Sequence, residues 1–148
     1  MTGLLLLFMM FYAACGLVLS FVAHVASFTT FQIGENALAL FWGVFPAFLS
    51  VILIDRTERK KKKGSASREE IDDWELVLAG CPLLLRYMFW ACFAYTFVLG
   101  IAIFVLDELN LAWRAASTCG AFALCMVFYA MGLAVFTAAY LRRRASPI

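Results

Sequence analysis

The sequence predicts an all-α, polytopic membrane protein with four transmembrane helices, and three observations predict this class. The run from Leu83 to Leu106 has Arg86 as its single charged residue, and three further runs are similarly long and apolar. Apolar residues make up 65% of the chain, against about 45–50% in a soluble domain. The mean hydropathy is +0.90. About 20 apolar residues in a helix cross the roughly 30 Å hydrocarbon core.

The four predicted spans cover about residues 4–25, 36–54, 83–106 and 111–141, arranged as two helical hairpins. Helices are expected because backbone groups in lipid must be hydrogen-bonded within their own segment, and no stretch alternates as a barrel strand does. The first run is expected to be a retained span, since no Lys or Arg precedes it and no small-x-small cleavage site follows it. With 148 residues, the chain is expected to form a single four-helix transmembrane domain, 1–148.

Lys and Arg lie almost entirely on one side of the predicted spans. That side carries Arg56, Arg59, Lys60, Lys61, Lys62, Lys63, Arg68, Arg86, Arg142, Arg143 and Arg144. The other side carries Arg114 alone. The positive-inside rule therefore places the basic segment 55–82 and both termini in the cytoplasm. We expect a multi-pass protein of the plasma or inner membrane.

The basic segment divides into two parts. The stretch 56–67 is basic and contains Gly and Ser, so we expect it to be mobile. Ser67 and Glu70 then have the spacing of a capping box, which predicts the start of a helix. Ile71, Trp74 and Val77 recur at helical spacing. We therefore expect a short amphipathic cytoplasmic helix before the third span, lying along the membrane interface.

A run of five basic residues within this segment has two interpretations. The run comprises Arg59, Lys60, Lys61, Lys62 and Lys63. It can contact anionic lipid headgroups, each basic residue contributing about 1 kcal/mol near the surface. Alternatively, it only determines the topology of the protein. Nucleic-acid binding is not expected, because no recognisable module or interleaved aromatic residues accompany the run.

Small residues at four-residue spacing mark each predicted span, and such stripes let helix backbones approach closely in lipid. The stripes comprise Gly16, Ser20 and His24; Ala39, Gly43 and Ala47; Cys92, Thr96 and Gly100; and Ala130, Ala134 and Ala138. They predict packing within the bundle or contacts with other subunits. Pro46 is expected to bend the second span near Gly43. The five cysteines are expected to be packing residues.

Two ionisable residues near the outer ends of spans form a candidate polar or ion site. His24 is the single histidine, and Glu35 lies across the short connection that follows it. Ionisable groups at membrane depth are functional candidates, so the pair is a hypothesis for proton or cation binding. The alternative is that both side chains are interfacial and contact water and headgroups.

The motifs of catalysis and cofactor binding are absent from the sequence. A second histidine for haem, an H-E-x-x-H motif, a phosphate-binding glycine loop and a Ser–His–Asp set are all missing. We expect no cofactor and no metal. The leading hypothesis is a non-enzymatic integral membrane protein that acts through helix–helix association, with itself or with other chains, as a subunit or partner-binding component of a membrane complex. The alternative is an oligomeric pore, channel or small-solute transporter, with His24 and Glu35 at its outer mouth and Pro46 allowing a gate.

Overall fold

Four long helices make up the computed structural model, which describes residues 3–28, 36–63, 77–108 and 113–145, with side chains described except at 36–38, 58–63, 106–108 and 113–118. The helices are α1 (Gly3–Ser27), α2 (Asn36–Lys63), α4 (Leu83–Glu108) and α5 (Trp113–Ala145). Each is long and apolar enough to cross a membrane. The prediction of an all-helical chain with four membrane-spanning helices is therefore confirmed.

The second helix extends beyond its predicted end. The span was expected to stop at Ile54 and to be followed by a mobile basic stretch, but α2 continues to Lys63. Residues 56–63 are therefore the helical continuation of α2. The reason is that Arg, Lys and Glu are good helix formers, so a helix that leaves the hydrocarbon core has no cause to end there. The amphipathic helix predicted from Ser67 lies mostly outside the described residues.

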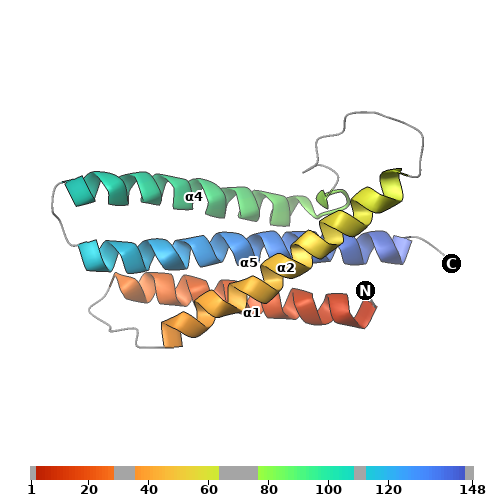
Figure 1. The fold of residues 1–148 in the computed structure, drawn as a ribbon, viewed down its shortest axis with the longest axis horizontal. Coiled ribbons are helices and arrows are strands. Elements are labelled where there is room, and N and C mark those ends of the chain that lie inside the picture. The colour runs from red at the N-terminus through yellow and green to blue at the C-terminus, as the bar shows by residue number, and fades with distance from the viewer. Residues whose placement is uncertain (1–2, 29–35, 64–76, 109–112, 146–148) are drawn as a thin grey trace.

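Helix α5 is the centre of the bundle. It packs against α1, α2 and α4, and its most extensive interface is with α1. In the most apolar stretch of each helix, 72% of the α5 residues are buried but only 6% of the α4 residues. Figure 1 shows α1 and α4 on opposite sides of α5, with α2 crossing obliquely. Helix α1 has a more extensive interface with α5 than with its sequence neighbour α2.

Close packing on α5 follows from its small residues. The fully buried residues of α5 include Ala123, Ala130, Ala134, Ala138, Val135 and Phe136. Apolar side chains gain little from leaving lipid for protein, so helices in a membrane associate where small residues allow close contact. The density of such residues in α5 explains why three helices surround this one.

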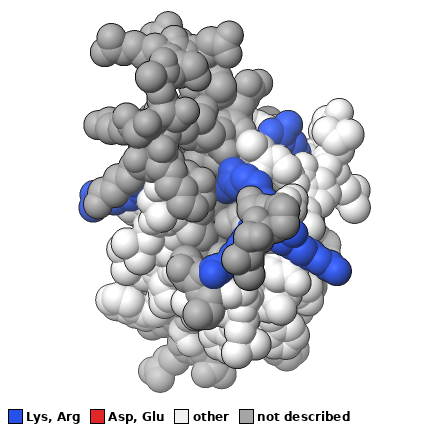
Figure 2. Space-filling model, turned by 90° about the vertical axis from the view of Figure 1, so that its right-hand side faces the viewer, with Lys and Arg blue, Asp and Glu red and all other residues white. Residues whose placement is uncertain are grey.

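The two termini of the bundle lie at the same end of the molecule (Figure 1). We call this the basic end, because the described arginines gather there: Arg56, Arg86, Arg142, Arg143 and Arg144. Figure 2 views the molecule from this end. The described parts of α1 and α4 run away from the basic end, and α2 and α5 run toward it.

Candidate functional site

His24 lies in a buried polar cluster at the end of the bundle opposite the basic end. Its side chain is 3% exposed. Nδ1 lies 3.0 Å from the carbonyl oxygen of Cys119 in α5, and Nε2 lies 2.6 Å from the hydroxyl of Tyr95 in α4. A carbonyl oxygen only accepts, so Nδ1 donates to Cys119, and Nε2 is hydrogen-bonded to the Tyr95 hydroxyl. One side chain of α1 is thereby bonded to two other helices.

Aromatic rings close this cluster. The His24 ring makes edge-to-face contacts with Phe28 at 5.1 Å and with Tyr95 at 5.4 Å between ring centroids. Ser27 Oγ donates to the carbonyl oxygen of His24 at 2.6 Å. With both ring nitrogens bonded, the described His24 side chain does not fit the expectation of contact with water and headgroups. Its predicted partner, Glu35, lies outside the described residues.

The cluster contains two residues of types that bind metal ions, His24 and Cys119. Cys119 Sγ lies 3.5 Å from His24 Nδ1. Among the described residues, no group of three or more His, Cys, Asp or Glu side chains is placed to hold a metal ion. The hydrogen bonds of His24 join α1 to α4 and α5, and we call this group of residues the polar clasp.

Gly16 and Ser20 belong to the same α1 stripe as His24, and both are buried in the bundle. Ser20 is fully buried, and its Oγ has no hydrogen-bond partner among the described residues. A Cβ added to Gly16 would overlap the ring of Tyr129 in α5. Glycine is therefore required at this position by the close approach of the ring.

Two tyrosines hold α2 at the turn that precedes Pro46. Tyr12 of α1 donates to the carbonyl oxygen of Gly43 at 2.6 Å, and Tyr129 of α5 donates to that of Leu40 at 3.1 Å. Pro46 has no N–H to donate to the carbonyl of Trp42, four residues earlier. The two tyrosines bond to carbonyls in the same part of α2 and tie it to α1 and α5. We call this arrangement the tyrosine clamp.

Other members of the predicted stripes differ in their surroundings. Ala47 is fully buried, whereas Ala39 is exposed. Thr96 of α4 donates from Oγ1 to the carbonyl oxygen of Ala123 in α5 at 3.1 Å. A Cβ added to Gly100 would have no atom within 4 Å, so Gly100 does not contact another described helix.

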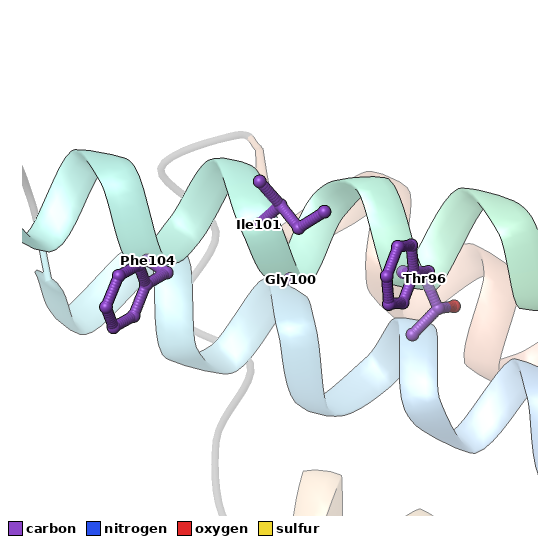
Figure 3. A pocket seen from close by; sticks show the side chains of 5 residues that line it. Thr96, Gly100, Ile101 and Phe104 are labelled. Carbon is purple, nitrogen blue, oxygen red and sulfur yellow. The ribbon is translucent and has the colours of Figure 1, made fainter.

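Gly100 lies instead in a shallow apolar groove on the exposed side of α4. The groove is lined by Thr96, Phe97, Gly100, Ile101 and Phe104 (Figure 3). Phe97, Ile101 and Phe104 are large and exposed, whereas Gly100 leaves a gap between them. We call this surface the α4 groove.

Arg86 lies at the basic end, half-buried beside the turn that leads into α4. Its Nη2 donates to the carbonyl oxygen of Leu78 at 3.1 Å. Burial raises the pKa of the neighbouring Cys81 thiol, and the Arg86 charge opposes that rise. The side chains of the predicted basic run, Arg59–Lys63, lie outside the described set, although their backbone forms the last part of α2.

Tyr12, Tyr95 and Tyr129 each form a hydrogen bond between helices, and the sequence reasoning missed all three. A signal was present, because a tyrosine hydroxyl within a membrane span needs a hydrogen-bond partner. The partners are backbone carbonyls and one histidine on other helices, which residue spacing within a single helix does not reveal.

No protein-family model, no curated protein and no solved structure matches this chain. The function must therefore be inferred from the contacts, burial and charges of its own residues.

Proposed function

We propose that this protein is a non-enzymatic subunit of a membrane complex and that it associates with another transmembrane helix through α4. The observation that carries the proposal is the α4 groove, where Gly100 leaves a gap between exposed Phe97, Ile101 and Phe104. Small residues beside large ones are typical of helix interfaces in lipid, because the gap admits a side chain of the partner.

The position of α4 in the bundle supports this proposal. Helices α1, α2 and α5 are joined by the tyrosine clamp, and α5 is largely buried. Helix α4 packs on α5 through one side and leaves a long, aromatic-rich side exposed. It is therefore the helix with the most surface available to a partner.

A second copy of the chain is the simplest partner. The α4 groove presents both a gap, at Gly100, and rings that fill gaps, at Phe97 and Phe104. A surface with both features is self-complementary, as a two-fold interface requires. A two-fold axis along the membrane normal would place two copies of α4 side by side and keep the same orientation for both chains.

Association is tested by the mass of the full-length chain purified in mild detergent. We expect a dimer for the natural chain and a monomer for Gly100→Ile, because the isoleucine fills the gap. Ala102→Ile is the matched control, since Ala102 is exposed on the same helix but does not line the groove. A monomeric natural chain that co-purifies with no other membrane protein would contradict the proposal.

The orientation that we propose places the basic end and both termini in the cytoplasm. It is supported by the gathering of the described arginines at one end of the bundle (Figure 2) and by the positive-inside rule. Reporter fusions after Gly64 and Ile148 should report the cytoplasm, and a fusion at Gln32 the opposite side. An external report from the Gly64 fusion would reverse the orientation.

The geometry gives less support to an oligomeric pore or transporter with His24 at its mouth. Both ring nitrogens of His24 are bonded within the protein, and the space beside α5 is filled by buried side chains such as Tyr129 and Phe136. Solute flux into proteoliposomes that is lost in a folded His24→Ala variant would favour this alternative over association.

A further inference from the structure

The basic end contains a second feature that is independent of association through α4. Arg86 Nη2 is bonded to the carbonyl oxygen of Leu78, but its Nε is shielded from solvent and has no hydrogen-bond partner among the described residues. An unpaired guanidinium N–H in such a place is costly, because it has lost water without gaining an acceptor. An acceptor from outside the described chain would relieve this cost.

Arg142, in the last turn of α5, lies beside the same turn of the chain. An added Cβ on Gly80 would lie 3.6 Å from Cγ of Arg142, so the arginine stem runs along this turn. Nε and Nη2 of Arg142 are also shielded from solvent. Two arginines therefore lie against the turn at 78–81: Arg86 of α4 at the carbonyl of Leu78, and Arg142 of α5 at Gly80.

The charged side chains that the structure describes at this end are mainly cationic. The described cationic side chains there are Arg56, Arg86, Arg142, Arg143 and Arg144. Asp55 is the single carboxylate among the side chains that the structure describes. Arginine binds phosphate oxygens through its planar set of N–H groups, and charge-assisted bonds of this kind are about twice as strong as neutral ones.

The level of the site and its apolar surroundings identify the class of ligand. Leu83 is both the first residue of α4 and the start of its candidate membrane span, so Arg86 lies one turn inside that span. A position one turn from the end of a span is expected near the level where headgroup phosphates meet acyl chains. Leu83, Leu84 and Tyr87 are large and exposed beside it. They offer an apolar surface for acyl chains next to two cations that bind phosphate.

We propose that Arg86 and Arg142, beside the turn at 78–81, bind the phosphate of an anionic lipid headgroup. Basic pockets between transmembrane helices bind anionic headgroups in this way. The site differs from the basic run Arg59–Lys63, because it joins α4 to α5 and is partly enclosed. Bound lipid would supply an acceptor for Nε of Arg86 and fix the turn that leads into α4.

The test is a titration of the detergent-purified full-length chain with phosphatidylglycerol or phosphatidylcholine, with bound lipid counted by native mass spectrometry. Arg86→Gln and Arg142→Gln should each lower the affinity for phosphatidylglycerol about tenfold, the loss expected when a charge-assisted pair is removed from an enclosed site. Binding of phosphatidylcholine should not change. Glutamine suits the test because it removes the charge but keeps a polar N–H donor.

Two exposed arginines at the same end provide matched controls. Arg56→Gln and Arg143→Gln remove the same charge and should change the affinity less than about twofold, because exposed charges interact weakly. Equal losses in all four variants would show diffuse attraction to surface charge and overturn the site. Unchanged affinity in Arg86→Gln would overturn it as well.

Two further experiments address variants that do not fold and the source of the bound phosphate. If a Gln variant does not fold, Arg86→Lys replaces it, because lysine keeps the charge. This variant should still weaken lipid binding severalfold, since lysine lacks the planar set of N–H donors. Unaltered lipid binding by Arg86→Lys would contradict the proposal. Inorganic phosphate at millimolar concentration should compete poorly with the lipid. Equal affinity for phosphate alone would assign the site to the free anion and overturn the assignment to lipid.

Discussion

At the scale of single residues, Gly16 and Gly43 are required because Tyr129 occupies the space that a side chain would need. An added Cβ on Gly43 would lie 2.5 Å from the Tyr129 hydroxyl and 2.9 Å from that of Tyr12. An added Cβ on Gly16 would overlap the Tyr129 ring itself. A ring held between three helices has little freedom to move, so these contacts tolerate no added atom.

We therefore predict that Gly16→Ala destabilises the folded protein by about 1–3 kcal/mol, the usual cost of overpacking a core. The free energy of unfolding is measured by titration with a denaturing detergent. Gly3→Ala, on the same helix, is the matched control, since nothing lies within 4 Å of its added Cβ. Equal stability of Gly16→Ala and the natural chain would show that the contact between α1 and α5 is not as close as described.

The polar clasp around His24 predicts a graded series of effects. Tyr95→Phe removes one hydrogen bond and should cost about 0.5–1.5 kcal/mol of unfolding free energy. His24→Ala leaves a cavity and removes the bonds to Tyr95 and to the Cys119 carbonyl, and it should cost about 2–4 kcal/mol. The same denaturation measurement checks both. A His24→Ala variant as stable as Tyr95→Phe would contradict the joining of three helices by this side chain.

At the scale of helices, α5 determines the packing of the other three. Its fully buried Ala134 lies in the main core, whereas Ala94 of α4 is exposed. The two positions share residue type and helical context but differ in burial. They therefore separate the effect of packing from that of helix propensity.

We predict that Ala134→Leu costs about 1–3 kcal/mol of unfolding free energy, because the larger side chain must displace a neighbouring helix. Ala94→Leu should change it by less than about 0.5 kcal/mol, as expected of a surface position. Both variants are compared by unfolding and by circular dichroism. Similar losses in the two would contradict the central place of α5.

The four spans could be predicted from the sequence because length and hydropathy alone define them. The helix that lies at the centre was not predicted, although the many Ala, Cys and Gly residues of α5 were a signal for it. The extension of α2 to Lys63 was missed because loss of hydropathy was taken as the end of the helix. Hydropathy reports the membrane boundary, whereas helix propensity governs where the helix ends.

The candidate site was predicted only in part, for a physical reason. His24, Gly16 and Gly43 were recognised from their spacing along single helices. Their partners, Cys119 and the tyrosines of the clamp, depend on how the helices are shifted and rotated against each other. One sequence does not contain that information in a periodic form.

At the scale of the whole molecule, the bundle has three distinct regions. The basic end carries arginines and the proposed lipid site, and the opposite end carries the buried clasp around His24. The exposed side of α4 carries an aromatic-rich groove with Gly100 at its gap. This division fits a protein that is anchored at one end and associates with a partner through one helix.

Cysteine cross-linking along α4 in membranes tests association most directly, using a full-length chain whose natural cysteines are replaced. Phe97→Cys, Ile101→Cys and Phe104→Cys line the groove and are each expected to give disulfide-linked dimers on mild oxidation. Val98→Cys and Val105→Cys are the controls, since both valines are exposed on α4 outside the groove. Efficient dimers at the three groove positions and few at the controls are the predicted result. Equal cross-linking at all five positions, or none at any, would contradict association of two copies through α4.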